Sequence, residues 1–438
     1  MKIEEKKLRE KIKENIKQIF EQREKEKKFI PGTSWIQYSG AVYDEKEINA
    51  SVSTLIDGWL GLGAKATEME QMLSQFVGTK GSIFTNSGSS ASLLAVASLC
   101  SPLLLNHLVR GDEVITPACC FPTTVNPLVQ YGLIPVFVDV NPETYNANVS
   151  DLEKALTKKT KAVFITHTLG NPNEMDKLVE FCNAHKLFLI EDNCDALGSE
   201  YEGKRTGGFG VLSTQSFYPA HHMTTGEGGA LNYNDLRFER IARSLRDWGR
   251  ACWCRSDEKR TQGACQARFK FKLGGKPYDH KYIFNQVGYN LKPIEAQASF
   301  GIEQLKKMPL FIKKRKQNFE RMYSYAKKWE DFFVLPKSMP KSNPCWFSFP
   351  FTIRDSAPFT RQELVTFLEH RMIQTRTVFA GNITKQPAYV HVPYRVMGTL
   401  DNSDRIMYNS FFVGIYPGLG KAEVDYMAEN MTDFLKRH

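Results

Sequence analysis

The sequence predicts an α/β protein: a three-layer α/β/α large domain followed by a smaller α+β domain. Short apolar runs such as SIFT, IPVFVDV, KAVFITHT and LFLIED recur through the first half of the chain, as expected for parallel strands buried on both faces. Stretches with helical periodicity separate these runs, which is typical of crossover helices. In the last quarter, the strand-like WFSFPFTI alternates with two helical stretches, which indicates a second, smaller unit.

We expect three parts along the 438 residues. Residues 1–50 form an N-terminal helical arm, residues 51–305 form the large domain, and residues 306–438 form the small C-terminal domain. Within the large domain, residues 250–285 are rich in polar residues and glycine and show little periodicity. This stretch is longer than a plain connection requires, so we interpret it as an insertion with a functional role.

The N-terminal arm is strongly charged and amphipathic. It contributes eleven Lys or Arg and seven Glu over residues 1–30, within a chain of net charge +10. Ile3, Leu8, Ile12 and Ile16 recur at helical spacing, so the arm is predicted to be a helix packed on the body or on a partner subunit. The alternative is a nucleic-acid patch, but few aromatic residues are interleaved with the basic ones. We therefore expect no nucleic-acid partner.

The composition excludes several classes of protein. No run of eighteen apolar residues is present, so no membrane partner is expected. The N-terminal stretch has no apolar core of a signal peptide, and a cytoplasmic location is expected. The nine cysteines are odd in number, and without a secretory signal a disulfide framework is not expected. Metal binding or buried thiols remain as explanations for them.

Four short motifs follow predicted strands. TNSGSSA places Gly88 at a predicted helix N-terminus, where free N–H groups attract anions. IED ends a buried strand at Asp192, and CCFPTT places Phe121 at another strand end. SFYPAHHMTTGEGG brings His221 and His222 to a strand-to-turn junction. Since α/β sheets bind ligands at the carboxyl ends of their strands, these motifs predict one shared site.

Together and in this order, the motifs resemble the sugar-modifying DegT/DnrJ/EryC1/StrS branch of the fold-type I pyridoxal-phosphate enzymes. The resemblance implies the aspartate-aminotransferase-like fold and a pyridoxal or pyridoxamine 5′-phosphate cofactor. It also implies that the cofactor is held by Gly88, Ser89, Phe121, Asp192, Asp195, Ser216 and Asn290.

The resemblance implies a role for each of these residues. Gly88 and Ser89, helped by Ser216, would hold the cofactor phosphate, while Phe121 would stack on the pyridine ring. Asp192 would pair with the protonated ring nitrogen.

Two further positions follow in the same way. Asp195 would contact the ring hydroxyl. Asn290, in GYNLKPIEAQ, would reach the phosphate across a homodimer interface.

The lysine of this family falls on His221. Because an imidazole cannot form the covalent bond that lysine makes with an aldehyde cofactor, we expect pyridoxamine phosphate, held without a covalent bond. Histidine can still serve as a general base near neutral pH. The resemblance therefore implies 3-dehydration of a nucleotide-linked 4-keto-6-deoxyhexose rather than amino transfer. The alternative for His221 is a buried core histidine, and His222 is assigned no role.

Four of the cysteines resemble the ligand set of the iron–sulfur 3-dehydratases in this family. Cys194 lies fifty-seven residues before the Cys252-x-Cys254 pair, and Cys265 follows after ten more. Four thiolates suit a 2Fe–2S cluster, although the same number can bind zinc. The last gap is longer than in the family pattern, and a lengthened loop would bring Cys265 to the other three ligands.

This resemblance also implies a substrate and a partner. It points to a CDP-linked sugar and to an NADH-dependent flavin and iron–sulfur reductase. FAGNITKQP, near residue 380, is expected to line the sugar-nucleotide pocket.

Other functions remain open at this point. One is a cluster-free 3-dehydratase that is recharged by glutamate, and another is an aminotransferase, which the missing lysine disfavours. From a different class, the chain could be a non-catalytic, zinc-containing protein that binds nucleotide sugars or nucleic acid.

Overall fold

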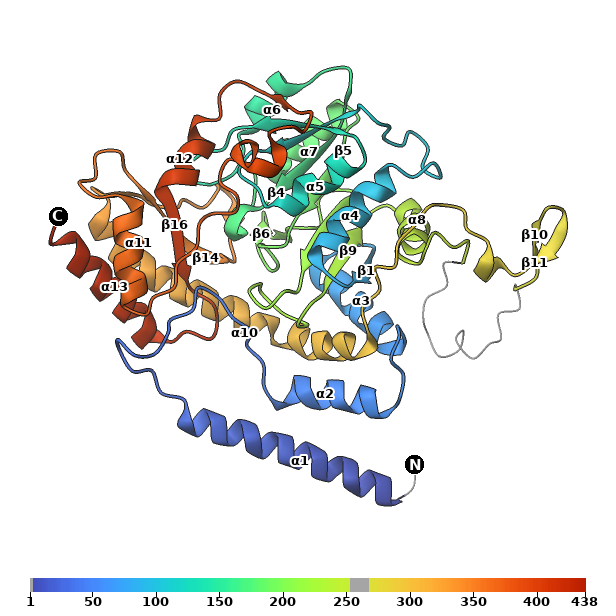
Figure 1. The fold of residues 1–438 in the computed structure, drawn as a ribbon, viewed down its shortest axis with the longest axis horizontal. Helices are drawn as coiled ribbons and strands as arrows, with labels where there is room; N and C mark the ends of the chain where they lie inside the picture. The colour runs from blue at the N-terminus through green and yellow to red at the C-terminus, as the bar shows by residue number, and fades with distance from the viewer. Residues whose placement is uncertain (1–2, 253–267) are drawn as a thin grey trace.

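A central eight-stranded sheet organises the larger part of the computed structural model, which describes residues 3–252 and 268–438 (Figure 1). Six neighbouring strands run parallel. At one edge, β9 pairs antiparallel with β8, and β1 pairs antiparallel with β9. In spatial order the strands are β1 (Gly81–Thr85), β9 (Gly229–Tyr233), β8 (Leu212–Ser216), β5 (Phe188–Asp192), β4 (Thr160–Thr166), β2 (Glu113–Pro117), β3 (Ile134–Val138) and β15 (Arg395–Val396). The predicted strand runs are confirmed.

Helices cover both faces of this sheet, because successive strand residues point to opposite sides. In β5, Ile190 packs into the core beneath one set of helices and Leu189 into the core beneath the other. The first face carries α4 (Gly88–Leu99), α5 (Pro122–Gln130) and α8 (Arg237–Arg246). The opposite face carries α3 (Ala64–Val77), α6 (Val149–Ala155), α7 (Met175–Ala184) and part of α10 (Glu295–Ala326). The three-layer α/β/α prediction is therefore confirmed.

The C-terminal unit is built on a small antiparallel sheet. Its strands are β12 (Phe333–Val334), β14 (Ser348–Ile353) and β16 (Ser410–Gly414), and its helices are α11 (Arg361–His370), α12 (Asp401–Asn409) and α13 (Lys421–Leu435). The long helix α10 runs from the large unit to this one (Figure 1). Because α10 crosses the expected boundary between residues 305 and 306, both units share it, and the exact division stays a prediction.

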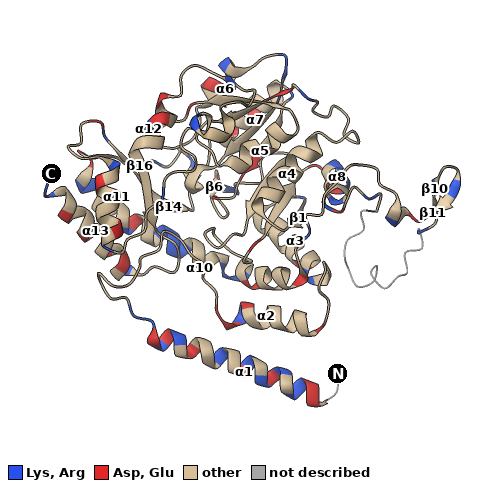
Figure 2. Cartoon of the chain, viewed as in Figure 1, with Lys and Arg blue, Asp and Glu red and all other residues tan. Residues whose placement is uncertain are grey.

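The N-terminal arm forms helix α1 (Ile3–Glu26), which lies beside α2 (Glu45–Ile56) at the edge of the molecule (Figure 1). No residue of α1 is buried, and an ion pair joins Arg9 to Asp57 at 2.7 Å. Basic and acidic residues are intermixed along the helix (Figure 2). Mixed charge of this kind is typical of a solvated helix rather than of a phosphate-binding stripe.

Short hairpins complete the described part of the chain. β10 (Phe271–Leu273) and β11 (Lys276–Tyr278) pair within the predicted insertion, residues 250–285, and project from the body (Figure 1). A second small sheet joins β6 (Glu200–Tyr201), β7 (Lys204–Arg205) and β13 (Ser342–Asn343). Among the described helices, none has the length and apolar content needed to cross a bilayer.

Candidate active site

A cavity of about 590 Å³ lies where the carboxyl ends of the central strands meet the C-terminal unit. Most of the residues predicted for the site line this one cavity. They are Gly88, Ser89, Phe121, Asp192, Cys194, Asp195, Ser216 and His221. Sequence positions that are far apart are therefore brought together as the strand-end argument expects.

The N-terminus of α4 forms one end of the cavity. Ser87 caps this helix by accepting a hydrogen bond from the Ser90 N–H at 3.0 Å, while Gly88 and Ser89 face the cavity. A Cβ atom added to Gly88 would lie 2.5 Å from Cβ of Ser216. The missing side chain therefore lets the helix end approach β8 closely. The free N–H groups of the first turn form a cradle suited to a phosphate.

Replacing Gly88 with alanine is expected to weaken binding of pyridoxamine phosphate about 10- to 100-fold. The new Cβ must push the helix end away from Ser216, which removes about one hydrogen bond to a charged group. Titrating cofactor-free protein with pyridoxamine phosphate, followed by absorbance, measures the effect. Gly61→Ala is the matched control, since nothing lies within 4 Å of its added Cβ. Equal affinity in the two variants would contradict the phosphate cradle.

Asp192 is held at the end of β5 by groups that fix its carboxylate. Oδ2 accepts a hydrogen bond from Thr124 Oγ1 at 2.6 Å, and Oδ1 accepts from the Cys194 N–H at 3.3 Å and from Thr214 Oγ1 at 3.4 Å. The side chain is nearly buried. A fixed, largely dry carboxylate fits the partner of a protonated pyridine nitrogen.

His221 and Asp195 lie side by side in the cavity wall. His221 Nδ1 is 3.3 Å from Asp195 Oδ1, within ion-pair distance but without hydrogen-bond geometry. Asp195 Oδ2 is also buried and has no hydrogen-bond partner among the described residues. Two buried polar atoms without hydrogen-bond partners among the described residues thus lie at the cavity, where a bound molecule would satisfy them. This arrangement fits a cofactor with a ring hydroxyl at Asp195 and a reacting carbon near His221.

Backbone contacts hold the turn that carries His221. Arg315, from the middle of α10, is fully buried and donates to the carbonyl oxygens of Phe347 at 2.7 Å and of His221 at 3.2 Å. Ser39 Oγ donates to the neighbouring carbonyl of Ala220. Burial lowers the pKa of Arg315 to about 10, so the guanidinium stays charged at neutral pH.

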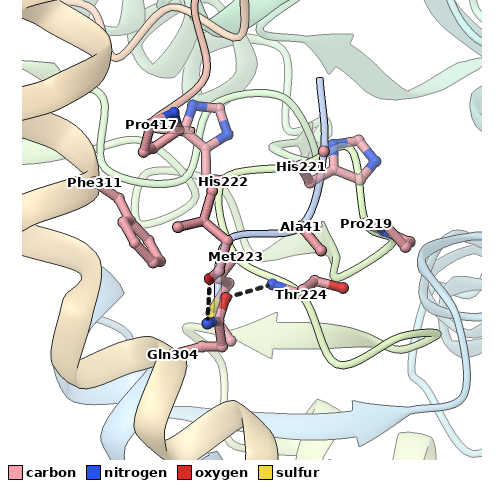
Figure 3. A pocket seen from close by; sticks show the side chains of 11 residues that line it. Ala41, Pro219, His221, His222, Met223, Thr224, Gln304, Phe311 and Pro417 are labelled. Carbon is pink, nitrogen blue, oxygen red and sulfur yellow. Dashed lines mark hydrogen bonds between the residues drawn. The ribbon is translucent and has the colours of Figure 1, made fainter. Parts of the chain in front are cut away.

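His222 has a different environment from His221. The two rings point to different sides of the turn (Figure 3). His222 is buried, and its Nε2–H donates to the carbonyl of Cys345 at 2.8 Å. Burial, reinforced by the charge of Arg315, lowers the pKa of His222 well below its ordinary value, so the ring is neutral. His222 is therefore a structural residue.

The same turn is anchored further along by Gln304 of α10. Its side-chain oxygen accepts a hydrogen bond from the Thr224 N–H at 3.1 Å, and its nitrogen donates to the Val42 carbonyl at 2.9 Å (Figure 3). These contacts link the N-terminal segment, the histidine turn and α10.

The structure describes only part of the predicted metal site. Cys194 lines the cavity two residues after Asp192, and Cys252 is half-buried at the end of its segment. Cys254 and Cys265 lie outside the described residues. Among the residues that are described, no group of three or more His, Cys, Asp or Glu could hold a metal ion. Burial, followed by the charge of Asp192, raises the pKa of Cys194 well above its ordinary value.

Asn290 does not line the cavity of its own chain. It is exposed and forms an isolated antiparallel bridge with Asp247. Its predicted contact with a phosphate needs a second copy of the chain, and this role stays a prediction.

Several cavity residues were not predicted individually. Phe379 belongs to the FAGNITKQP stretch that was expected to line the sugar-nucleotide pocket. Ser87, Thr123, Thr166, His167, Tyr218, Ala220, Glu227 and Phe347 lie within quoted sequence stretches but were given no role there. Tyr38, Leu169, Arg376, Thr377 and Phe412 lie outside those stretches. Thr124, which fixes Asp192, was also missed, although it belongs to the CCFPTT motif.

The sheet order, the covering helices and the strand-end cavity define a fold-type I, aspartate-aminotransferase-like protein of the pyridoxal-phosphate-dependent class. Residues 42–432 match the DegT/DnrJ/EryC1/StrS aminotransferase family, and the chain belongs to this family.

Two relatives cover nearly the whole chain. A lipopolysaccharide biosynthesis protein, RfbH, from Salmonella typhimurium is 44% identical over 98% of this chain and 98% of its own length. A dTDP-4-dehydro-2,6-dideoxy-D-glucose 3-dehydratase from Saccharopolyspora spinosa is 46% identical over 93% of this chain and 88% of its own.

A solved structure extends the comparison to the fold. GDP-4-keto-6-deoxy-D-mannose-3-dehydratase from E. coli, with bound hydrated pyridoxal phosphate, superposes with a TM-score of 0.80 at 30% identity. The match covers 90% of this chain and 98% of that one.

Proposed function

We propose that this protein is a pyridoxamine-phosphate-dependent 3-dehydratase of a nucleotide-linked 4-keto-6-deoxyhexose. The observation that carries the proposal is that His221, where the family resemblance expects a lysine, faces a cavity shared with Asp192 and Asp195. CDP-4-keto-6-deoxy-D-glucose is the proposed substrate, and an NDP-4-keto-3,6-dideoxyhexose is the proposed product.

The names of the relatives support the 3-dehydration reaction, but they differ in the nucleotide that the sugar carries. Two relatives are named 3-dehydratases of dTDP- and GDP-linked sugars, at 46% and 31% identity. The nucleotide is therefore tested by comparing CDP-, dTDP- and GDP-linked 4-keto-6-deoxyhexoses as substrates. Aminotransferase structures such as that from Psychrobacter cryohalolentis, at 23% identity, support the fold alone.

The residues of the cavity divide the chemistry among them. Bound pyridoxamine phosphate would supply an amine that condenses with the 4-keto group and a ring that withdraws electrons. The N-terminus of α4 would bind its phosphate, and Asp192 would keep its ring nitrogen protonated. His221 would remove a proton from the cofactor's 4′ carbon, which allows the hydroxyl on carbon 3 of the sugar to leave.

The reaction then needs two electrons and two protons, and NADH through a reductase is the proposed source. The net change converts the keto sugar, NADH and H⁺ into the 3-deoxy keto sugar, NAD⁺ and water. A 2Fe–2S cluster on Cys194, Cys252, Cys254 and Cys265 would pass the electrons one at a time. Of these four cysteines, Cys194 lies in the cavity wall, close to where the electrons would be delivered.

Recharging by glutamate is the second candidate route. It is favoured by a solved relative at 29% identity, a GDP-4-keto-6-deoxymannose-3-dehydratase that contains a trapped pyridoxal phosphate–glutamate geminal diamine. Incubating the pyridoxal phosphate form with glutamate and following the absorbance of the cofactor tests this route directly.

Spectra of anaerobically purified protein separate the two routes. The reductive route predicts visible absorption that bleaches with dithionite and a low-temperature electron paramagnetic resonance signal, together with iron and labile sulfide. Cys252→Ala is expected to abolish reduction of the sugar while water is still eliminated; Cys182→Ala, at a thiol outside the ligand set, is the control. Zinc without sulfide would favour the non-catalytic alternative. Colourless, metal-free protein that turns over with glutamate would leave the glutamate-recharged route.

A homodimer is part of the proposal, because the role of Asn290 requires a second chain at each site. Size-exclusion chromatography with light scattering tests the oligomeric state.

A further inference from the structure

The cavity wall is dominated by negative charge. Asp192, Asp195 and Glu227 contribute carboxylates, whereas Arg376 is the only lysine or arginine among the described residues that line it. A ligand with two or more negative charges would be repelled by such a wall unless a cation met its charged part. The position of Arg376 therefore determines where that part can bind.

Arg376 is not committed to a protein carboxylate. No Asp or Glu in the described chain lies within ion-pair distance of its guanidinium, and Nη1 donates to the carbonyl of Thr375 at 2.6 Å. Arg315, the nearby arginine beneath the His221 turn, does not line the cavity, and it already donates to two backbone carbonyls. The remaining donors of Arg376 are available to a ligand in the cavity.

The side chain of Arg376 is also held in place. Its backbone N–H donates to the carbonyl of Phe412 at 3.2 Å, and the N–H of Phe412 donates back at 2.7 Å. The guanidinium lies over the ring of Tyr38, 4.4 Å from the centroid. Stacking on an aromatic face reduces the freedom of the side chain before a ligand arrives, which favours binding.

The segment from Arg376 to Phe379 connects this cation to the cofactor site. Phe379 packs edge-on against Phe121, the predicted partner of the pyridine ring, with ring centroids 6.3 Å apart. Its φ is +46°, a left-handed conformation that is costly for a bulky residue and typical of functional segments. A substrate that reacts beside Phe121 would extend its far end along this segment toward Arg376.

We propose that Arg376 is the subsite for the diphosphate of the nucleotide-linked substrate. A guanidinium offers paired donors that match phosphate oxygens, whereas the cofactor phosphate would occupy the N-terminus of α4. This inference rests on the proposed function and assigns the anion-binding group of the same cavity.

The test uses full-length protein loaded with pyridoxamine phosphate and titrated with CDP and dTDP by calorimetry. Arg376→Gln is expected to weaken both nucleotides about 10- to 100-fold, as for the loss of hydrogen bonds to a charged group. The nucleotide affinities of Arg376→Lys should lie between those of the wild type and those of Arg376→Gln, because lysine keeps the charge without the paired donors. Arg437→Gln is the matched control: this exposed arginine also lies over an aromatic ring, that of Phe367, but outside the cavity. In turnover, Arg376→Gln should raise KM with little change in kcat.

Nucleotide affinities in Arg376→Gln equal to those of the wild type would overturn the proposal. The same holds if wild-type protein binds neither nucleotide. Unchanged nucleotide binding with loss of the glutamate reaction alone would assign Arg376 to a carboxylate instead. If nucleotide binding depends on Arg376 but no 4-keto sugar is dehydrated, the subsite stands and the proposed function fails.

Discussion

Replacing His221 with asparagine is expected to slow cleavage of the C3–O bond about 10²- to 10⁴-fold, the range of general acid–base catalysis. Asparagine keeps a polar side chain of similar size but cannot accept and return a proton at neutral pH. Binding of pyridoxamine phosphate should change little, since the predicted phosphate and ring contacts come from Gly88, Ser89 and Asp192. Single-turnover mixing of the cofactor-loaded protein with the 4-keto sugar measures the elimination step.

The control for this experiment is His185→Asn, at an exposed histidine that is outside the cavity and 3.8 Å from Glu153. It should eliminate water at the wild-type rate. His221→Lys serves as a second test, because its amine can again bond covalently to pyridoxal phosphate and change the absorbance. Normal elimination by His221→Asn would remove His221 from the mechanism, and loss of cofactor binding would reassign it to binding.

The strand-end residues could be predicted because their signal is local. A short apolar run that ends in Asp192 or leads to Gly88 places that residue at the carboxyl end of a strand. In an α/β sheet, these strand ends lie together at one site. His221 needed the family resemblance in addition, since a histidine in a turn is not informative alone. In the structure, eight of the predicted residues line one cavity, as the strand-end argument expects, while their roles stay predictions.

The supporting residues could not be predicted, because their contacts join distant parts of the chain. Ser39 reaches Ala220 across 181 positions, and Arg315 reaches His221 across 94. Within α10, Arg315 is an arginine in a long, charged helix, and its burial depends on packing against the C-terminal unit. Arg376 has no motif of its own, and only the folded cavity reveals that it is the single described cation there.

The buried carboxylate of Glu191 should be the most sensitive stabilising group near the site. It is fully buried directly before Asp192 and accepts four hydrogen bonds. Oε1 accepts from the N–H groups of Phe209 and Gly210 at 2.7 and 2.6 Å. Oε2 accepts from the Gly207 N–H at 2.7 Å and from His167 Nε2 at 3.0 Å.

Glu191→Gln is expected to lower the free energy of unfolding by about 3–5 kcal/mol at pH 7. In glutamine, an NH2 group replaces one of the two carboxylate oxygens. In either orientation of the amide, this NH2 group points at two N–H donors of the surrounding protein, and no hydrogen bond forms there. Denaturation in urea measures the loss. Glu143→Gln is the matched control, because Glu143 is partly exposed and pairs at 2.7 Å with the exposed Lys337, a contact expected to contribute less than about 1 kcal/mol.

The pH dependence of stability provides an independent check on Glu191. Burial alone would raise its pKa, but the hydrogen bond from His167 and those from the turn outweigh burial, and its pKa lies below the ordinary 4.5. A carboxyl with a lowered folded-state pKa stabilises the protein fully above its unfolded-state pKa. This stabilisation is lost as the pH falls from there through the folded-state pKa. The difference between wild type and Glu191→Gln should therefore shrink below about pH 4.5. A constant difference across that range would mean that Glu191 is not ionised in the folded protein, and that the turn beside Asp192 is held by a neutral acid.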